Sequence, residues 1–257
     1  MRYPLCVVPA IILFTVISIS AQKTENQASA LYNAGVQKLG EGDAQGAIEP
    51  FSKAAALEPD NEQYVYSLGF AYYKANDLPK AEQLFVRATK LRPSDHLAFN
   101  QLGAVLFALG RPAEACDTFS TAVNLAPSEP QILENAGRAC MSAERFKQAI
   151  AYLERGKEVN PDDFYVRVFL GYSYSKRREY KEAIVEFETA AKLNPTEPLV
   201  QYYLGSLYLA AKDKLAAIRQ QKKVELLDAS LGEKLYREIY GDKVVDVSDI
   251  KAFGPRE

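Results

Sequence analysis

Histidine and cysteine are too scarce in this chain of 257 residues to suggest a metal centre or a catalytic triad. The chain has one histidine, His96, and three cysteines, and none of them cluster at the spacing of metal ligands. No candidate nucleophile has a base beside it, and the acidic residues are scattered along the sequence. We therefore expect no catalytic residues, no metal, no cofactor and a protein that is not an enzyme.

A block of like charge is also missing. The chain carries 31 basic and 33 acidic residues, and its formal net charge is −2. Hydrophobic residues make up 48% and charged residues 25%, which is ordinary for a folded soluble protein. A balanced charge of this kind argues against a surface for nucleic acid.

Only one long apolar run is present, and it lies at the N-terminus. Arg2 precedes an uncharged stretch from Leu5 to Ile19, and small residues follow up to Ala21. This order predicts a secretory signal over residues 1–21 and a periplasmic or extracellular protein. The alternative is an uncleaved membrane anchor, because the run is just shorter than the roughly 17–25 residues of a spanning helix. No second run exists, so we expect no membrane span after this segment.

The cysteines allow two interpretations. Cys6 lies inside the apolar run and acts as a small apolar residue. Export would permit a disulfide between Cys116 and Cys140. Both of these, however, fall on apolar faces where cysteine packs as a small hydrophobe, and we favour that interpretation.

Glycine recurs at a fixed interval of 34 residues, and other residue types recur with it. The glycine column contains Gly35, Gly69, Gly103, Gly137, Gly171 and Gly205. A proline column contains Pro59, Pro93, Pro127, Pro161 and Pro195, and an alanine column contains Ala47, Ala81, Ala115, Ala149, Ala183 and Ala217. A column of large apolar residues contains Phe51, Phe85, Phe119, Leu153 and Phe187. The chain is therefore predicted to be a repeat protein.

Each repeat is predicted to be a helix hairpin. In residues 60–93, Asp60 is expected to cap a first helix, Asn76-Asp77 to break it and cap a second, and Pro93 to follow the second helix. The capping column contains Asp60, Ser94, Ser128, Asp162 and Thr196. Interior glycine destabilises a helix by about 0.5–1 kcal/mol, so we expect the glycine column to mark the closest crossing of the two helices. One hairpin cannot bury its apolar seam alone, so neighbouring hairpins must stack.

This pattern resembles the tetratricopeptide repeat family. The second repeat carries it through Val65, Leu68, Gly69, Tyr72, Ala81, Phe85, Ala88 and Pro93, and the resemblance extends over about 200 residues. The sixth repeat keeps Leu204, Gly205, Tyr208 and Ala217 and then loses the pattern at Gln221. The resemblance implies an all-α, right-handed α-solenoid with a concave groove lined mainly by the first helix of each hairpin.

The expected organisation follows from the repeat. A linker over residues 22–27 leads into an array over 28–228, and a capping helix over 229–241 precedes a tail over 242–257. The repeats lie near 28–59, 60–93, 94–127, 128–161, 162–195 and 196–228. The tail keeps five apolar residues, so we expect it either to lie on the last repeat or to contact a partner.

The predicted groove is rich in aromatic residues. Its candidate binding residues are Tyr32, Tyr66, Phe70, Tyr73, Asn100, Phe107, Glu134, Arg138, Tyr172 and Tyr202. We expect the densest aromatic face, Tyr66, Phe70 and Tyr73, to point away from the seam between paired helices. Tyrosine suits a wet recognition surface, although burial against the next repeat would also explain single residues. Glu134 and Arg138 also have the i, i+4 spacing of a helical ion pair.

Two functions fit these observations. The resemblance implies an adaptor or scaffold whose groove binds a peptide or helix of a partner protein. The alternative is a structural spacer or assembly factor of an envelope complex, acting through the convex face and the C-terminal tail. The repeat pattern does not identify the partner.

Overall fold

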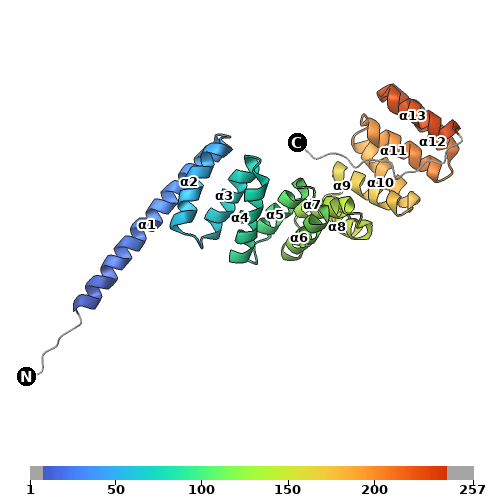
Figure 1. Ribbon diagram of the computed structural model, residues 1–257. Coiled ribbons are helices and arrows are strands. Elements are labelled where there is room, and N and C mark those ends of the chain that lie inside the picture. The colour runs from blue at the N-terminus through green and yellow to red at the C-terminus, as the bar shows by residue number, and fades with distance from the viewer. Residues whose placement is uncertain (1–7, 242–257) are drawn as a thin grey trace, which may run out of the picture. The chain divides into compact units, whose positions relative to one another are not determined.

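A computed structural model describes the backbone of residues 8–241 and the side chains of residues 22–241. The predicted tail over 242–257 and the first seven residues of the predicted signal lie outside the described residues. The described residues form thirteen α-helices (Figure 1): α1 (Val8–Gly40), α2 (Ala44–Leu57), α3 (Glu62–Lys74), α4 (Leu78–Leu91), α5 (His96–Ala108), α6 (Pro112–Leu125), α7 (Pro130–Ser142), α8 (Phe146–Val159), α9 (Phe164–Lys176), α10 (Tyr180–Leu193), α11 (Pro198–Ala210), α12 (Lys214–Leu227) and α13 (Ala229–Tyr240). This is the predicted all-α arrangement of about six hairpins and one capping helix.

The helices fall into two compact units. Unit 1 ends at Gly110 and contains α1 to α5, and unit 2 begins at Arg111 and contains α6 to α13. In unit 1, α1 packs against α2, α3 against α4, and each second helix against the first helix of the next hairpin. In unit 2, the pairs α7–α8, α9–α10 and α11–α12 follow one another in the same way, and α13 packs on both α11 and α12.

A seam of large and small apolar side chains holds each hairpin together. Phe51, Phe85, Phe119 and Phe187 are among the largest fully buried side chains, and the alanine column is completely buried. The glycine column stands directly against this seam. A Cβ atom added at Gly171 would lie 2.6 Å from the ring of Phe187. The predicted close crossing is therefore confirmed, because no larger residue fits there without a shift of the seam.

The turn inside each hairpin uses a left-handed residue that the sequence analysis did not single out. Positive φ angles occur at Gly42 (80°), Asn76 (62°), Gly110 (74°), Glu144 (59°), Arg178 (62°) and Lys212 (68°), again 34 residues apart. Only glycine, and to a lesser degree asparagine, adopts this conformation at low cost. The last three repeats thus keep the turn geometry with residues that disfavour it.

The capping prediction is right for α4 and wrong by one residue for the first helices. Asp77 caps α4 by accepting a hydrogen bond from the backbone N–H of Lys80 at 3.3 Å. The N-cap of each first helix from α3 onward lies one position after Asp60 and its column. Asp95 accepts from the N–H of Leu97 at 2.8 Å and Asp163 from that of Tyr165 at 2.9 Å, whereas Asn61 makes no side-chain cap bond. A cap must be the last residue before helical backbone, and those helices begin one residue later than predicted.

The predicted linker over residues 22–27 is helical. It forms part of α1, a single helix of 33 residues that continues into the first repeat. Among the helices built from described residues, none is long and apolar enough to span a membrane.

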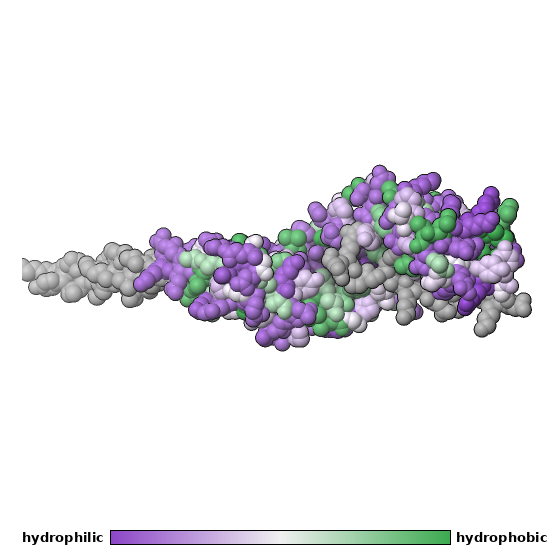
Figure 2. Space-filling model, turned by 90° about the horizontal axis from the view of Figure 1, so that it is seen from above, coloured by the Kyte–Doolittle hydropathy of each residue, from purple (hydrophilic) through white to green (hydrophobic). Residues whose placement is uncertain are grey.

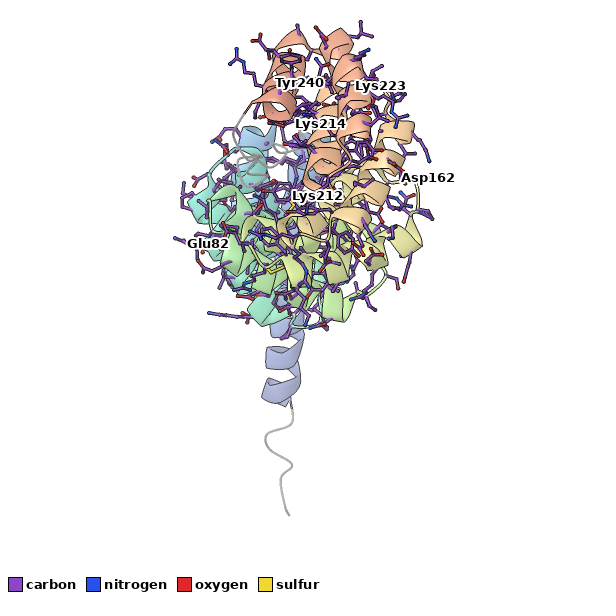
Figure 3. All side chains as sticks on the ribbon, turned by 90° about the vertical axis from the view of Figure 1, so that its right-hand side faces the viewer. Glu82, Asp162, Lys212, Lys214, Lys223 and Tyr240 are labelled. Carbon is purple, nitrogen blue, oxygen red and sulfur yellow. A yellow bond between two sulfur atoms is a disulfide. The ribbon has the colours of Figure 1, made fainter. Side chains whose placement is uncertain are left out.

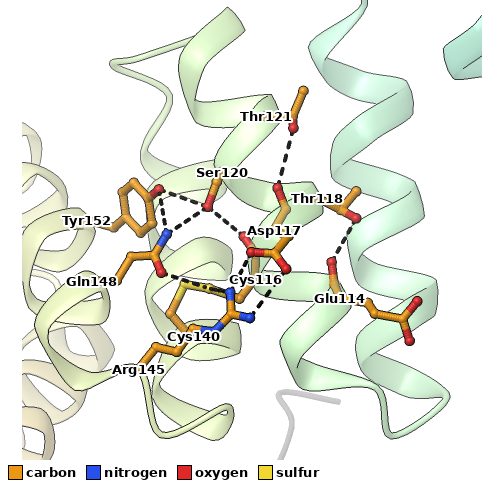
Figure 4. Close-up of a disulfide and its surroundings, with 10 residues drawn as sticks. All are labelled: Glu114, Cys116, Asp117, Thr118, Ser120, Thr121, Cys140, Arg145, Gln148 and Tyr152. Atoms are coloured by element: carbon orange, nitrogen blue, oxygen red, sulfur yellow. Dashed lines mark hydrogen bonds and ion pairs between the residues drawn. A yellow bond between two sulfur atoms is a disulfide. The ribbon is translucent and has the colours of Figure 1, made fainter.

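The two cysteines of the array form a disulfide. Cys116 of α6 and Cys140 of α7 are both fully buried, and their Cα atoms lie 4.7 Å apart (Figure 4). The prediction that they remain separate small hydrophobes is therefore wrong. They lie in different repeats, 24 residues apart, and a repeat pattern shows that each faces a seam but not that the two seams meet at that point.

The C-terminal helix α13 covers the end of unit 2. Its buried face includes Leu235 and Ile239, while Tyr236 and Tyr240 are half exposed. Lys214 lies over the ring of Tyr240, with 5.2 Å between its ammonium nitrogen and the ring centroid (Figure 3). The view in Figure 2 shows a largely hydrophilic face with separate small hydrophobic patches. A helix with one apolar and one polar face is expected where stacking stops.

Candidate functional site

Unit 1 contains a hollow of about 400 Å³, which we call the unit 1 hollow. It is lined by Tyr32, Glu62, Gln63, Tyr66, Ser67, Arg92, Asp95 and Leu97. Tyr32 comes from α1, the next four residues come from the first two turns of α3, and the last three lie around the start of α5. First helices of three successive repeats therefore contribute to one concave surface.

Tyr32 and Tyr66 occupy equivalent positions one repeat apart, and the structure brings both into the hollow. The Nε2 atom of Gln63 donates a hydrogen bond to the hydroxyl of Tyr32 at 3.0 Å. The ring centroid of Tyr66 lies 5.5 Å from that of Phe85, in an edge-on arrangement. Phe85 belongs to the buried seam, so the expectation that Tyr66 points away from the seam is wrong. A half-buried tyrosine supports the seam with one face of its ring and lines the hollow with the rest.

The most buried polar group of the hollow is Glu62, whose side chain is only 7% exposed. Its Oε2 atom lies 3.3 Å from Nη1 of Arg92, and its Oε1 atom is buried without a hydrogen-bond partner. Burial raises the pKa of Glu62, the guanidinium of Arg92 opposes this shift, and the carboxylate of Asp95 adds to it. The hollow thus holds a carboxyl group whose charged form is poorly compensated.

The remaining predicted residues of unit 1 lie outside the hollow. Phe70 and Tyr73 follow Tyr66 along α3 and are half-buried, and the ammonium nitrogen of Lys74 lies 5.4 Å from the ring centroid of Phe70. Asn100 and Phe107, also half-buried, lie on α5. The structure therefore brings two of the six unit 1 candidates together in a concavity.

The four predicted residues of unit 2 have different surroundings. Glu134 on α7 is 5% exposed, and Arg138 one turn later is half-buried. Tyr172 on α9 is half-buried, with its ring centroid 6.4 Å from that of Phe146. Tyr202 on α11 is 4% exposed. The capping helix α13 contacts Tyr202 and accounts for the burial of this tyrosine.

Glu238 and Lys234 of α13 hold Tyr202 in place. Glu238 accepts hydrogen bonds from the hydroxyls of Tyr202 and of Ser206, the latter at 2.8 Å. Lys234 lies over the ring of Tyr202, 4.9 Å from its centroid. Burial and Glu238 together raise the pKa of Tyr202. Tyr202 is thus engaged by the chain itself.

The charged residues of the unit 1 hollow were not predicted from the sequence, although a signal for two of them exists. Glu62 is the only acidic residue in a column that otherwise reads Ala28, His96, Pro130, Phe164 and Pro198. Arg92 is the only basic residue in its column, which otherwise reads Glu58, Ala126, Asn160, Asn194 and Asp228. Because each of these two charges is found in one repeat only, the stacking of repeats does not require them.

A second hollow, of about 550 Å³, lies in unit 2 among α10, α11 and α12, and we call it the unit 2 hollow. Tyr208 at its wall donates a hydrogen bond to Glu188 at 2.6 Å, and Leu226 at its rim is 88% exposed. It contains none of the ten predicted residues. Within the described part of the chain, no three potential metal-binding side chains of His, Cys, Asp or Glu lie together.

Comparison with known proteins agrees with the repeat pattern and the helical hairpins. Family models described as tetratricopeptide repeat match residues 38–104, 106–168 and 169–225, more than half of the chain. No curated protein matches the sequence.

Several solved structures share the fold. YrrB, described as a TPR protein with an unusual peptide-binding site, is 21% identical with a TM-score of 0.68, over 74% of this chain and 99% of that one. PilF of Pseudomonas aeruginosa is 20% identical with a TM-score of 0.64, over 86% of this chain and 100% of that one. MamA from Desulfovibrio magneticus RS-1, from residue 41 to its end, is 22% identical with a TM-score of 0.62. The match covers 66% of this chain and 97% of that one. The repeat columns, the hairpins and the family models lead to one conclusion: this chain belongs to the tetratricopeptide repeat family.

Proposed function

We propose that the protein is a non-enzymatic adaptor that binds a peptide segment of a partner protein in the unit 1 hollow. The observation that carries this proposal is the hollow itself, which has tyrosines from two successive repeats on its wall. Tetratricopeptide repeats typically mediate contacts between proteins, and YrrB shows by its description that a protein of this fold can hold a peptide.

The surface chemistry fits a peptide. Tyr32 and Tyr66 offer apolar ring surface, and Gln63 and Ser67 offer hydrogen-bonding groups in the same concavity. A hollow of about 400 Å³ has room for two or three side chains of a segment, at the lower end of the range for small ligand sites. An extended segment would continue along α3 past Phe70 and Tyr73, which remain partly exposed.

The test is to fill the hollow without disturbing the seam. Peptides that bind the purified protein are first selected from a random library displayed on phage. Ser67→Arg places a long side chain at a half-exposed position of the hollow and should weaken binding of a selected peptide at least tenfold. Gln83→Arg adds the same side chain at an exposed position of α4 and should leave the affinity unchanged. Equal affinity of folded Ser67→Arg for every selected peptide would end the proposal.

We further propose that the protein is exported, with residues 1–21 as its signal. The disulfide between Cys116 and Cys140 supports an oxidising compartment, because such bonds are rare where thiols are kept reduced. The charged–apolar–small order of the N-terminus is a second, independent indication. Mass measurement of the protein isolated from its cells should show loss of about 21 residues. An intact N-terminus would favour the membrane anchor instead.

One observation favours the alternative role in assembly of a larger complex. Leu226 and Leu227 at the end of α12 are 88% and 38% exposed and line the unit 2 hollow. Contiguous apolar patches on a protein surface mark sites of contact with other proteins. If this surface carries the function, Leu226→Ser should abolish assembly with the partner while Ser67→Arg has no effect.

A further inference from the structure

The unit 1 hollow has a surplus of acidic groups. Its lining includes two carboxylates, those of Glu62 and Asp95, and a single cation, the guanidinium of Arg92. The other lining residues are uncharged. The side chain of Arg92 is 58% exposed, so it extends largely into solvent while its partner Glu62 is buried. A ligand group in this hollow therefore meets more negative than positive charge, and the negative charge is the better fixed of the two.

The acidic groups are also incompletely satisfied. One oxygen of Asp95 accepts the N–H of Leu97 as a helix cap. One oxygen of Glu62 contacts Arg92, and the other is buried with no hydrogen-bond partner. Buried acceptors of this kind are rare in folded proteins, and each calls for a specific explanation. Burial raises the pKa of Glu62 and Arg92 opposes this shift, while the charge of Asp95 and a hydrogen bond with it raise the pKa further, so the two carboxyl groups lie close to one another.

The aromatic walls suit a cation. The chain already places ammonium groups over rings in unit 1: Lys80 lies over Tyr72 at 4.9 Å and Lys74 over Phe70 at 5.4 Å from the ring centroids. Tyr32 and Tyr66 present rings to the hollow beside the carboxylates. A long basic side chain can lay its methylene stem on a ring and carry its charge to a carboxylate.

We propose that the hollow recognises its partner segment through one lysine or arginine side chain, whose charged group is received by Glu62 and Asp95 between Tyr32 and Tyr66. This rests on the proposed function, and it adds the chemistry that selects the partner. A partner carboxylate inside the hollow is disfavoured, because Glu62 and Asp95 would repel it.

The experiment uses the phage-selected peptides as probes. Peptides whose binding is blocked by Ser67→Arg should share a lysine or arginine at one position, and replacing that residue with norleucine should weaken binding at least tenfold. Glu62→Gln should weaken binding of the basic peptide by a similar factor and leave binding of the norleucine peptide unchanged. Glu49→Gln, which removes an exposed acidic group of α2, is the matched control and should change neither affinity.

The two proposals fail in different ways. Blocked peptides that carry no shared basic residue, or that bind Glu62→Gln and wild type equally, would overturn the role of the acidic groups and leave the hollow as a peptide site. Peptides that bind Ser67→Arg normally would overturn the hollow as a site altogether. If Glu62→Gln unfolds, the affinities of the basic and norleucine peptides for the wild-type protein still test the proposal, because that comparison changes only the peptide.

Discussion

At the scale of single residues, two kinds of constraint can be distinguished in this chain. The glycine column serves packing, because Cβ atoms added at Gly35, Gly137 and Gly171 would each meet a buried side chain of the seam. The repeat does not dictate an acidic residue at the position of Glu62, because the equivalent positions of other repeats hold alanine, histidine, proline or phenylalanine. Residues that the stacking of hairpins needs recur from repeat to repeat, whereas contacts made once, such as the Cys116–Cys140 disulfide, leave no periodic signal.

Gly171→Ala should destabilise the protein by about 1–3 kcal/mol, the usual cost of overpacking a core. The added methyl group would lie 2.6 Å from Phe187, whereas nothing lies within 4 Å of a Cβ atom added at Gly40, the last residue of α1. Chemical denaturation of both variants checks this. Equal stability of Gly171→Ala and Gly40→Ala would contradict the close-packing role of the column.

Glu62→Gln should become more stabilising, relative to wild type, as the pH rises. The pKa of Glu62 is raised above its ordinary value of 4.5 in the fold, so the folded state binds the proton more tightly than the unfolded state. The stabilisation that protonated Glu62 gives to the wild-type fold is complete below pH 4.5. It is lost as the pH rises through the higher pKa of the folded state.

Urea denaturation of wild type and Glu62→Gln between pH 4 and pH 8 measures this difference. The difference in unfolding free energy should shift in favour of the glutamine variant above about pH 4.5. A shift in favour of wild type would show that Arg92 more than offsets the burial of the carboxylate.

At the scale of helices and hairpins, contacts that recur every 34 residues tie consecutive hairpins together. The hydroxyl of Tyr174 on α9 donates to Glu154 on α8 at 2.8 Å, and Tyr208 on α11 makes the equivalent bond to Glu188 on α10. Burial and these carboxylates raise the pKa of both tyrosines. Cys140 occupies the same column in α7, where the disulfide takes the place of the hydrogen bond.

Arg178→Gly should stabilise unit 2 by about 0.5–1 kcal/mol. Arg178 has a φ of 62° in the turn between α9 and α10, and the left-handed conformation disfavours residues with a Cβ by roughly 1–2 kcal/mol. The greater freedom of glycine in the unfolded chain offsets part of that gain. Lys181→Gly, three residues later in α10, should instead destabilise the protein, and thermal denaturation of the two variants distinguishes these outcomes.

At the scale of the whole molecule, the fold class could be predicted from the sequence and the functional detail could not. The 34-residue period predicts helix pairs, seam residues and glycine positions, because stacking imposes the same contacts on every repeat. The disulfide, the packing of Tyr66 on Phe85 and the pairing of Glu62 with Arg92 depend on which neighbours meet in space. A periodic pattern carries no information on contacts that occur only once.

Reduction of the disulfide should lower the unfolding free energy by about 3 kcal/mol, as expected for a closed loop of some two dozen residues. Both cysteines are fully buried, so dithiothreitol should reduce the native protein slowly and the partly denatured protein fast. Denaturation with and without reductant measures the effect. Identical curves, with free thiols confirmed by mass, would show that the bond contributes nothing to stability.

The most direct test of the binding site is a crystal structure of the protein with a phage-selected peptide. We predict that the peptide lies in the unit 1 hollow, with a lysine or arginine nitrogen within about 4 Å of the Glu62 carboxylate and its stem against Tyr32 or Tyr66. A peptide bound instead at the unit 2 hollow, beside Leu226, would contradict the unit 1 hollow as the site of partner recognition.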